Sequence, residues 1–143
     1  MPNIEPEAIK NLINYMDLDK CEIGTLASHI SSDAELEDQN IVKVLVKDKM
    51  KPGMFVEALD FIRTYPTKDL IPFHHIGIYA FTNKALIKYV SLKRSKLELS
   101  RKLEQLRAID NGIKIDMFKI DRFDSFGIDT EEDLLKFKEF ISS

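Results

Sequence analysis

Three groups of side chains in this sequence have the chemistry to bind a ligand. They are Asp129, the pair His75 and Tyr79, and the adjacent Glu104 and Gln105. Asp129 follows a predicted strand and precedes a predicted helix, where a carboxylate can face a ligand or a hard cation beyond the end of a sheet. Aspartate is also among the commonest helix N-caps, so local spacing leaves both roles open for Asp129.

His74 and His75 are adjacent in a segment rich in aromatic and β-branched residues, which predicts a strand. Because neighbouring side chains of a strand point to opposite faces, the two imidazoles do not suit a paired metal site. Tyr79 lies four residues after His75 and therefore on the same face. Local pattern favours a hydrogen-bonded structural role for either histidine and a core position for Tyr79, and contact with a ligand is the alternative for each.

Glu104 and Gln105 belong to a segment with helical spacing, on the flank of its apolar face. Their carboxylate and amide groups can hydrogen-bond the hydroxyls of a polyol. The alternative is that both are solvated surface residues. Gly-x-x-x-x-Gly-Lys-Ser/Thr, Gly-x-Gly-x-x-Gly and Gly-x-Ser-x-Gly do not occur in the sequence, so a self-contained P-loop, dinucleotide or serine-hydrolase site is not expected.

The elements that would position these residues alternate between strands and helices. Helices are predicted over residues 6–17 and 84–90, and from Thr130 onward; strands are predicted over 22–30, 41–47, 73–81 and 113–120, while 54–63 fits either a strand or a short helix. This alternation predicts an α/β fold, a sheet flanked by helices. A chain of 143 residues has the size of a single domain, 1–143.

A further helix is predicted from Ser95 to Asn111-Gly112. Ser95 and Glu98 form a capping box at its start, and one apolar face follows, made by Leu99, Leu103, Leu106 and Ile109. The last helix begins with Thr130 and Asp133 as a second cap and has Leu134, Leu135 and Phe137 to bury.

Composition and charge restrict the partners. A formal net charge of -3 gives no general attraction to nucleic acid, and no segment has the roughly 20 apolar residues of a membrane span. We therefore expect neither nucleic-acid binding nor membrane insertion. The single cysteine, Cys21, cannot close a disulfide within the chain, which favours a reducing compartment and a cytoplasmic location.

Five short motifs, taken in order, resemble the 3-deoxy-manno-octulosonate (Kdo) cytidylyltransferase family, the CMP-Kdo synthetases. They are His-Ile-Gly-Ile-Tyr at 75–79, Ser-Lys-Leu-Glu at 95–98, Leu-Glu-Gln-Leu-Arg at 103–107, Asn-Gly-Ile-Lys-Ile at 111–115 and Gly-Ile-Asp-Thr-Glu-Glu-Asp-Leu at 127–134. The similarity continues upstream through 24–27 and 40–44 and covers nearly the whole chain. On these motifs the chain is similar to the carboxy-terminal part of such an enzyme.

The resemblance implies part of a Rossmann-like nucleotidyltransferase sheet and a role for each candidate. In that family the matching histidine, tyrosine, glutamate and glutamine line the sugar pocket, which maps to His75, Tyr79, Glu104 and Gln105, and the arginine of a Phe-Ser-Arg segment maps to Arg63. The aspartate of Gly-x-Asp-Thr holds Mg²⁺, which maps to Asp129. The implied reaction is attack by the anomeric hydroxyl of Kdo on the α-phosphate of CTP, with release of pyrophosphate, by a homodimer.

Departures from the family pattern limit what this chain is expected to do alone. Lys96 and Arg101 stand where the family usually has proline and glutamate. Residues 1–6 resemble the stretch after the family's Gln-Gly-Asp motif, so that aspartate, the cytosine pocket and the phosphate-binding loop have no counterpart here. We expect binding of Kdo, or of a close relative such as its 8-amino form, without CTP binding or transfer. The alternatives are a subunit of a split enzyme and a non-catalytic sugar-binding or assembly module.

Overall fold

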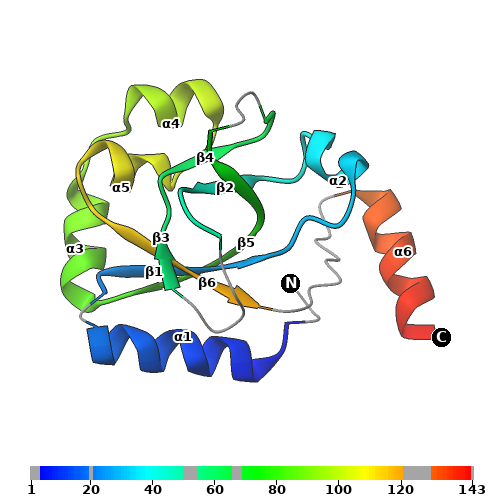
Figure 1. The fold of residues 1–143 in the computed structure, drawn as a ribbon, viewed down its shortest axis with the longest axis horizontal. Coiled ribbons are helices and arrows are strands. Elements are labelled where there is room, and N and C mark those ends of the chain that lie inside the picture. Colours follow the sequence, from blue (N-terminus) through cyan, green and yellow to red (C-terminus); the bar gives the residue numbers. More distant parts are fainter. Residues whose placement is uncertain (1–3, 20, 50–54, 66–68, 121–129, 143) are drawn as a thin grey trace.

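The chain folds around a curled six-stranded mixed sheet (Figure 1). The computed structural model describes residues 4–19, 21–49, 55–65, 69–120 and 130–142. The strands are β1 Ile23–Ser28, β2 Lys43–Val46, β3 Phe55–Glu57, β4 Asp60–Ile62, β5 Ile71–Phe81 and β6 Ile115–Ile120. Their order is β3-β6-β1-β5-β2-β4, in which β1 and β6 are parallel and the other pairs antiparallel. This confirms the predicted α/β class.

Six helices flank this sheet within the described part of the chain. They are α1 Pro6–Asp19, α2 Asp33–Glu37, α3 Asn83–Ser91, α4 Lys96–Arg101, α5 Leu106–Asp110 and α6 Glu131–Ser142. In Figure 1, α1 covers one side of the sheet, α3, α4 and α5 gather at one end, and α6 stands apart from the body. None of the described helices is long and apolar enough to cross a membrane.

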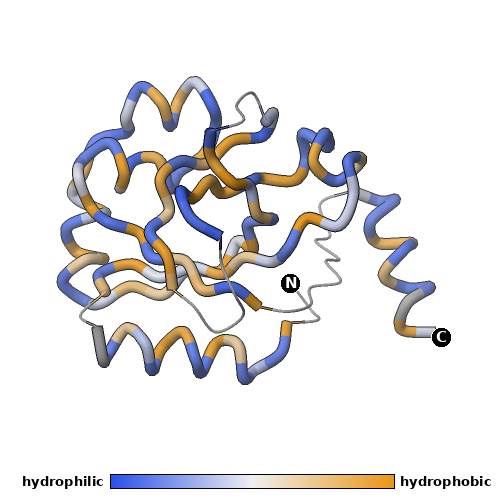
Figure 2. The backbone as a smooth tube through the Cα atoms, in the orientation of Figure 1, coloured by the Kyte–Doolittle hydropathy of each residue, from blue (hydrophilic) through white to orange (hydrophobic). Residues whose placement is uncertain are grey.

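Each face of the sheet buries its own apolar cluster. Under α1, a small cluster forms from Ala8, Leu12, Leu26, Ile76 and Phe118. Helix α1 lies so close to β1 that a Cβ added to Gly24 would stand 2.7 Å from Cδ1 of Leu12, so a larger residue here would force the Leu12 side chain to shift. The alternation of polar and apolar residues along α1, seen in Figure 2, is what places Leu12 and Met16 against the sheet.

The larger cluster fills the other face, beneath α3 and α5. Its buried members include Ile23, Ala27, Val44, Phe61, Phe73, Leu106, Ile113 and Met117. Since alternate residues of a strand share a face, Ile23 and Ala27 of β1 place Thr25 between them on this same side. The functional side chains discussed below lie over or within this cluster.

The predicted continuous helix after Ser95 is wrong. The capping box of Ser95 and Glu98 is present, but α4 ends at Arg101, and Lys102 adopts a left-handed conformation with φ 56° and ψ 45°. Helix α5 begins only at Leu106. The break buries Leu103 and Leu106 in the larger cluster and leaves Leu99 exposed, so core packing overrides the helical period of the sequence.

The structure also tests the predictions made for residues 54–63 and for the last helix. Residues 54–63, which fitted a strand or a helix, contain the short strands β3 and β4. The cap of the last helix is confirmed, because Thr130 and Asp133 exchange hydrogen bonds of 3.1 Å. Burial of its leucines is wrong: Leu134 and Leu135 are exposed, since α6 stands apart from the sheet.

Candidate functional site

A pocket of about 370 Å³ lies between β5, α3 and the link from α4 to α5. It is lined by Ile23, Tyr79, Phe81, Leu86, Tyr89, Val90, Lys102, Leu103, Glu104, Gln105, Ala108 and Ile115. The structure therefore brings together three of the predicted site residues, Tyr79, Glu104 and Gln105, although helices α3 and α4 separate Tyr79 from the other two in the sequence. An apolar floor with a few convergent polar groups is typical of a small-molecule site.

His75 lies behind Tyr79 rather than in the wall of the pocket. The centroids of these two rings are 5.4 Å apart, and the Phe61 ring makes a T-shaped contact with the imidazole at a centroid distance of 4.9 Å. Burial, with a smaller contribution from His74, lowers the pKa of His75 to about 3, so the imidazole is neutral. Burial also raises the pKa of the Tyr79 phenol well above its usual range, and the nearby Tyr89 and Glu104 add to this shift. Tyr79 is therefore a protonated donor.

Glu104 and Gln105 lie in the link between α4 and α5, not on a helix flank as predicted. The left-handed Lys102 turns the chain into this link. The hydroxyl of Tyr89, from α3, then donates to the carbonyl oxygen of Glu104 at 2.9 Å. Because Glu104 is held by its backbone, its carboxylate remains available to a ligand.

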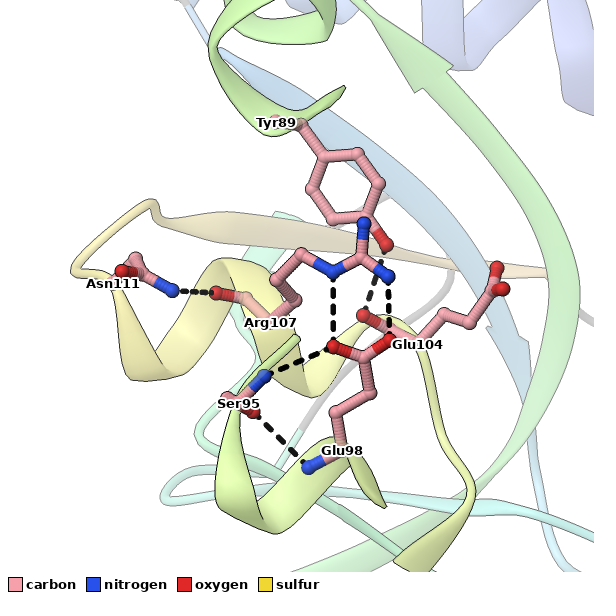
Figure 3. A network of polar contacts seen from close by, with 6 residues as sticks. All are labelled: Tyr89, Ser95, Glu98, Glu104, Arg107 and Asn111. Carbon is pink, nitrogen blue, oxygen red and sulfur yellow. Dashed lines mark hydrogen bonds and ion pairs between the residues drawn. The ribbon is translucent and has the colours of Figure 1, made fainter. Parts of the chain in front are cut away.

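A buried ion pair stabilises this wall of the pocket (Figure 3). The guanidinium of Arg107 donates to both carboxylate oxygens of Glu98, with Nη2 at 2.5 Å and Nε at 2.9 Å, and also lies 4.9 Å from the centre of the Tyr89 ring. The hydrogen bonds from Arg107 are the main reason that the pKa of Glu98 lies below its ordinary value. Since Glu98 also caps α4 through Ser95 and Arg107 lies over Tyr89, the Glu98–Arg107 pair joins α3, α4 and α5.

Three residues of this site were not predicted: Tyr89, Lys102 and Arg107. Arg107 closes the Leu-Glu-Gln-Leu-Arg motif, and Tyr89 sits on the inward face of a correctly predicted helix, so both carried a signal. Lys102 carried none, because lysine has no preference for the left-handed region.

Arg63 does not line this pocket. Its Nη1 donates to the carbonyl oxygen of Gln39 at 3.2 Å, and its own carbonyl accepts from Lys43. Lys43 has no exposed surface, and its Nζ lies 2.5 Å from both the Arg63 and the Asp38 carbonyl oxygens. We call this group, Lys43 with Asp38, Gln39 and Arg63, the β2 edge.

The predicted metal ligand, Asp129, lies outside the described residues. Among the residues that are described, there is no group of three or more histidine, cysteine, aspartate or glutamate side chains that would hold a metal ion. The described side chains alone therefore do not make a Mg²⁺ site, and magnesium binding stays a prediction.

Comparison with known proteins places the chain in a family. Residues 1–115 match the family profile described as Cytidylyltransferase. Among curated relatives, the 3-deoxy-manno-octulosonate cytidylyltransferase of Bartonella bacilliformis is 35% identical over 146 residues, that of Nitrobacter hamburgensis 38% over 143, and that of Thermodesulfovibrio yellowstonii 40% over 140. These matches cover 99%, 99% and 93% of this chain but 58%, 54% and 54% of the relatives. The chain thus spans a little over half of their length.

Solved structures agree with this placement. A CMP:2-keto-3-deoxy-manno-octonic acid synthetase complexed with CTP superposes with a TM-score of 0.83 at 32% identity, covering 99% of this chain and 58% of that one. The UTP-bound UGPase of Acinetobacter baumannii reaches a TM-score of 0.53 at 10% identity, over 94% of this chain and 50% of its own, which shows a shared fold only. The sheet flanked by helices is therefore the nucleotidyltransferase fold that the motifs implied.

Proposed function

Because the chain belongs to the cytidylyltransferase family, we propose that it forms the sugar-binding, carboxy-terminal part of an enzyme that transfers CMP from CTP to Kdo and releases pyrophosphate. One observation carries this proposal. Tyr79, Glu104 and Gln105, which the motifs assigned to the sugar, line one pocket although they come from different elements. Relatives named for this reaction match along nearly the entire chain.

The polar groups of the pocket suit a polyhydroxy acid. The Tyr79 phenol donates a hydrogen bond, the Glu104 carboxylate accepts one, and the Gln105 amide can do both. Lys102, in the same wall, supplies a positive charge for the carboxylate of the sugar acid. The role of these residues in the reaction is to bind and orient the sugar so that its anomeric hydroxyl can attack the α-phosphate.

The chain covers 58% and 54% of two relatives named for this reaction, and we propose that the nucleotide side belongs to the part of them that it does not cover. We therefore propose that this chain does not bind CTP or transfer CMP by itself. Asp129 is the proposed Mg²⁺ ligand, and Mg²⁺, when bound, would neutralise charge on the phosphates.

Self-association as a homodimer is also proposed. Exposed apolar side chains of α3 support it: Ile87 is 70% exposed, and Val90, which also lines the pocket, is 66% exposed, so a second copy packed there would cover apolar surface. Size-exclusion chromatography with light scattering tests it directly, and a single monomeric peak at micromolar concentration would contradict it. A cytoplasmic location, expected from the lone Cys21, stays a proposal as well.

Calorimetry with Kdo and the 143-residue chain is the main test. We expect saturable binding that is weakened about tenfold by Glu104→Ala or Gln105→Ala, because each removes a hydrogen bond to the sugar. Asp110→Asn, at an exposed position on α5, is the control and should bind as wild type does. Absence of Kdo binding by the folded wild-type chain would contradict the proposed function.

A second assay separates the enzyme part from a binding module. Pyrophosphate release from CTP and Kdo should be absent with this chain alone, and its detection would overturn the proposal that the chain is inactive alone. Release that appears only after the missing part of a relative is supplied in trans would favour a split enzyme. Binding of Kdo with no release under either condition would favour the non-catalytic module.

A further inference from the structure

The antiparallel pairing of β1 with β5 is interrupted by a bulge next to the pocket. Thr25 pairs with Tyr79, but the next residue of β1 pairs with Ile76. Gly77 and Ile78 are therefore extra residues of β5 that no residue of β1 opposes. Bulges bend a strand and are frequent beside active sites, where they re-aim a side chain. Here the residue that follows the bulge is Tyr79, which lines the pocket.

The hydroxyl of Thr25 closes this bulge from the side of β1. Thr25 has no exposed surface, and its hydroxyl oxygen lies 2.7 Å from the carbonyl oxygen of Ile78 and 3.3 Å from that of Ile76. Because carbonyl oxygens only accept, the hydroxyl donates its single hydrogen, mainly across the shorter distance to Ile78. Since Ile78 has no pairing partner in β1, this hydrogen bond takes the place of one in the regular ladder.

The Thr25 hydroxyl supports Tyr79 in two ways. The Ile78 carbonyl belongs to the planar peptide group that links Ile78 to Tyr79, so a hydrogen bond to it fixes the plane from which the Tyr79 side chain departs. Nε2 of His75 lies 2.9 Å from the same hydroxyl oxygen, and the His75 ring packs against the Tyr79 ring at a centroid distance of 5.4 Å. Thr25 therefore contacts both the backbone before Tyr79 and the ring behind it.

We propose that Thr25 is a positioning residue, whose hydroxyl holds the bulge of β5 and thereby sets the place of the Tyr79 phenol in the pocket wall. Binding of the sugar acid by that phenol rests on the proposed function, whereas the placement of the phenol does not. Thr25 is buried and does not line the pocket, so it acts on a ligand only through Tyr79. The Glu104 part of the wall has its own support in the Tyr89 hydroxyl.

Proton NMR of the full 143-residue chain tests this placement without a ligand. A buried hydroxyl that donates a hydrogen bond exchanges slowly with water, so we expect a separate signal for the Thr25 hydroxyl proton. Because a carbonyl oxygen lies close to the next α-carbon in a trans peptide, this proton should show a cross-peak to the α-proton of Tyr79. A Thr25 hydroxyl proton in rapid exchange, or one without this cross-peak, would overturn the proposal.

Two variants show whether the hydroxyl is what holds the Tyr79 ring. Thr25→Ser keeps the hydroxyl, and Thr25→Val replaces it with a methyl group at little change of shape. We expect the cross-peaks between the Tyr79 and His75 rings to persist in Thr25→Ser and to weaken in Thr25→Val. Unchanged cross-peaks in folded Thr25→Val would overturn the proposal. Should this variant fail to fold, the hydroxyl proton of the wild-type chain still decides.

Calorimetry with Kdo measures the effect of Thr25 on the pocket. We expect Thr25→Val to weaken binding about fivefold and Thr25→Ser to stay within about twofold of wild type. Thr64→Val makes the same chemical change at an exposed position and is the control, which should bind as wild type does. Unchanged affinity in folded Thr25→Val would overturn the inference while leaving the proposed function intact.

Double variants separate action through Tyr79 from a general loosening of the fold. In the Tyr79→Phe background, Thr25→Val should cost less than about twofold, because the phenol hydroxyl that it displaces is already gone. In the Glu104→Ala background it should cost the full factor of about five, since Glu104 is held separately. Equal losses in both backgrounds would overturn the proposal. Failure of the folded wild-type chain to bind Kdo would contradict the proposed function, and the ligand-free spectra would still decide the placement of Tyr79.

Discussion

Two buried charges organise different parts of this molecule, and they are satisfied in different ways. Glu98, under the wall of the pocket, is paired with the guanidinium of Arg107 by two hydrogen bonds. Lys43, at the β2 edge, forms no ion pair with a carboxylate of the described residues; its Nζ instead donates to the backbone carbonyls of Asp38 and Arg63. The first arrangement joins side chains of three helices, and the second fixes the backbone of two loops.

This difference explains why Glu104 lies in the pocket wall with its side chain available to a ligand, whereas Arg63 does not line the pocket. In the pocket, pairing of Glu98 with Arg107 and the Tyr89 hydroxyl on the Glu104 carbonyl hold the wall from behind, so the side chains of the wall can face a ligand. At the β2 edge, the guanidinium of Arg63 itself takes part in holding the loop. A polar network therefore leaves functional groups available only where other residues supply the support.

The largest expected effect is on the pocket network. Arg107→Met leaves the Glu98 carboxylate buried without its cation, and we expect it to lower the free energy of unfolding by about 3 kcal/mol. Chemical denaturation measures this change. Lys93→Met, at an exposed position beyond α3, is the control and should cost less than about 0.5 kcal/mol. Equal losses for the two variants would show that the ion pair does not stabilise the fold.

Lys43→Met should have the next largest effect, about 2 kcal/mol, because two buried carbonyls lose their donor. The loss is smaller than for Arg107 because methionine also removes the cost of burying an ammonium group. Thermal unfolding of Lys43→Met beside Lys47→Met, at an exposed position near the end of β2, tests it. A stable Lys43→Met protein would mean that the β2 edge is held by its other contacts.

We expect the pocket network to lose stability as the pH is lowered into the acidic range. Hydrogen bonds from Arg107 lower the pKa of Glu98 below its ordinary 4.5. Burial would raise the pKa of Glu35, but hydrogen bonds from Ser31 and His74 together lower it as well. Groups with lowered pKa stabilise the fold above about pH 4.5, and this contribution is lost as the pH falls.

We therefore expect Glu98→Gln to flatten the fall of stability below about pH 4.5 more than Glu35→Gln does, since the Glu98 carboxylate is the more deeply buried. Denaturation curves collected between neutral and acidic pH give the comparison. A steeper acid dependence left in Glu98→Gln than in Glu35→Gln would reverse the ranking of the two regions.

The smallest expected effect concerns Arg63, whose assignment to the sugar stays a prediction. Because its guanidinium is held by Gln39, we expect Arg63→Ala to weaken Kdo binding by less than about twofold, and Lys102→Ala, in the pocket wall, to weaken it more. Calorimetry ranks the two. A larger loss for Arg63→Ala would place that arginine with the sugar and would require the β2 edge to rearrange on binding.

Much of this fold could be predicted from local pattern. Pro6, the Ser95–Glu98 capping box and the aromatic run of β5 each mark an element whose type the structure confirms. The shared face of His75 and Tyr79 also followed from the period of a strand. These features depend only on residues that are close together in the sequence, so a single sequence is enough to predict them.

The parts that failed depend on contacts between distant segments. Leu99, Leu103 and Leu106 have helical spacing, yet burial against β1 and β6 is reached only with a break at Lys102. The support of Glu104 by Tyr89 joins residues fifteen positions apart, and no local pattern encodes it. The hydrogen bond from the buried Thr25 hydroxyl to the Ile78 carbonyl likewise lies at a register shift that appears only when β1 and β5 pair.

The break at Lys102 has a consequence for how the protein folds. The isolated segment around residues 95–111 has the sequence of one continuous helix, so we expect a synthetic peptide of this segment to be helical through Lys102 in a helix-promoting solvent. The left-handed turn then forms only when the sheet and Tyr89 are already in place to hold Glu104. The wall of the pocket would be among the last parts of the molecule to take its native shape.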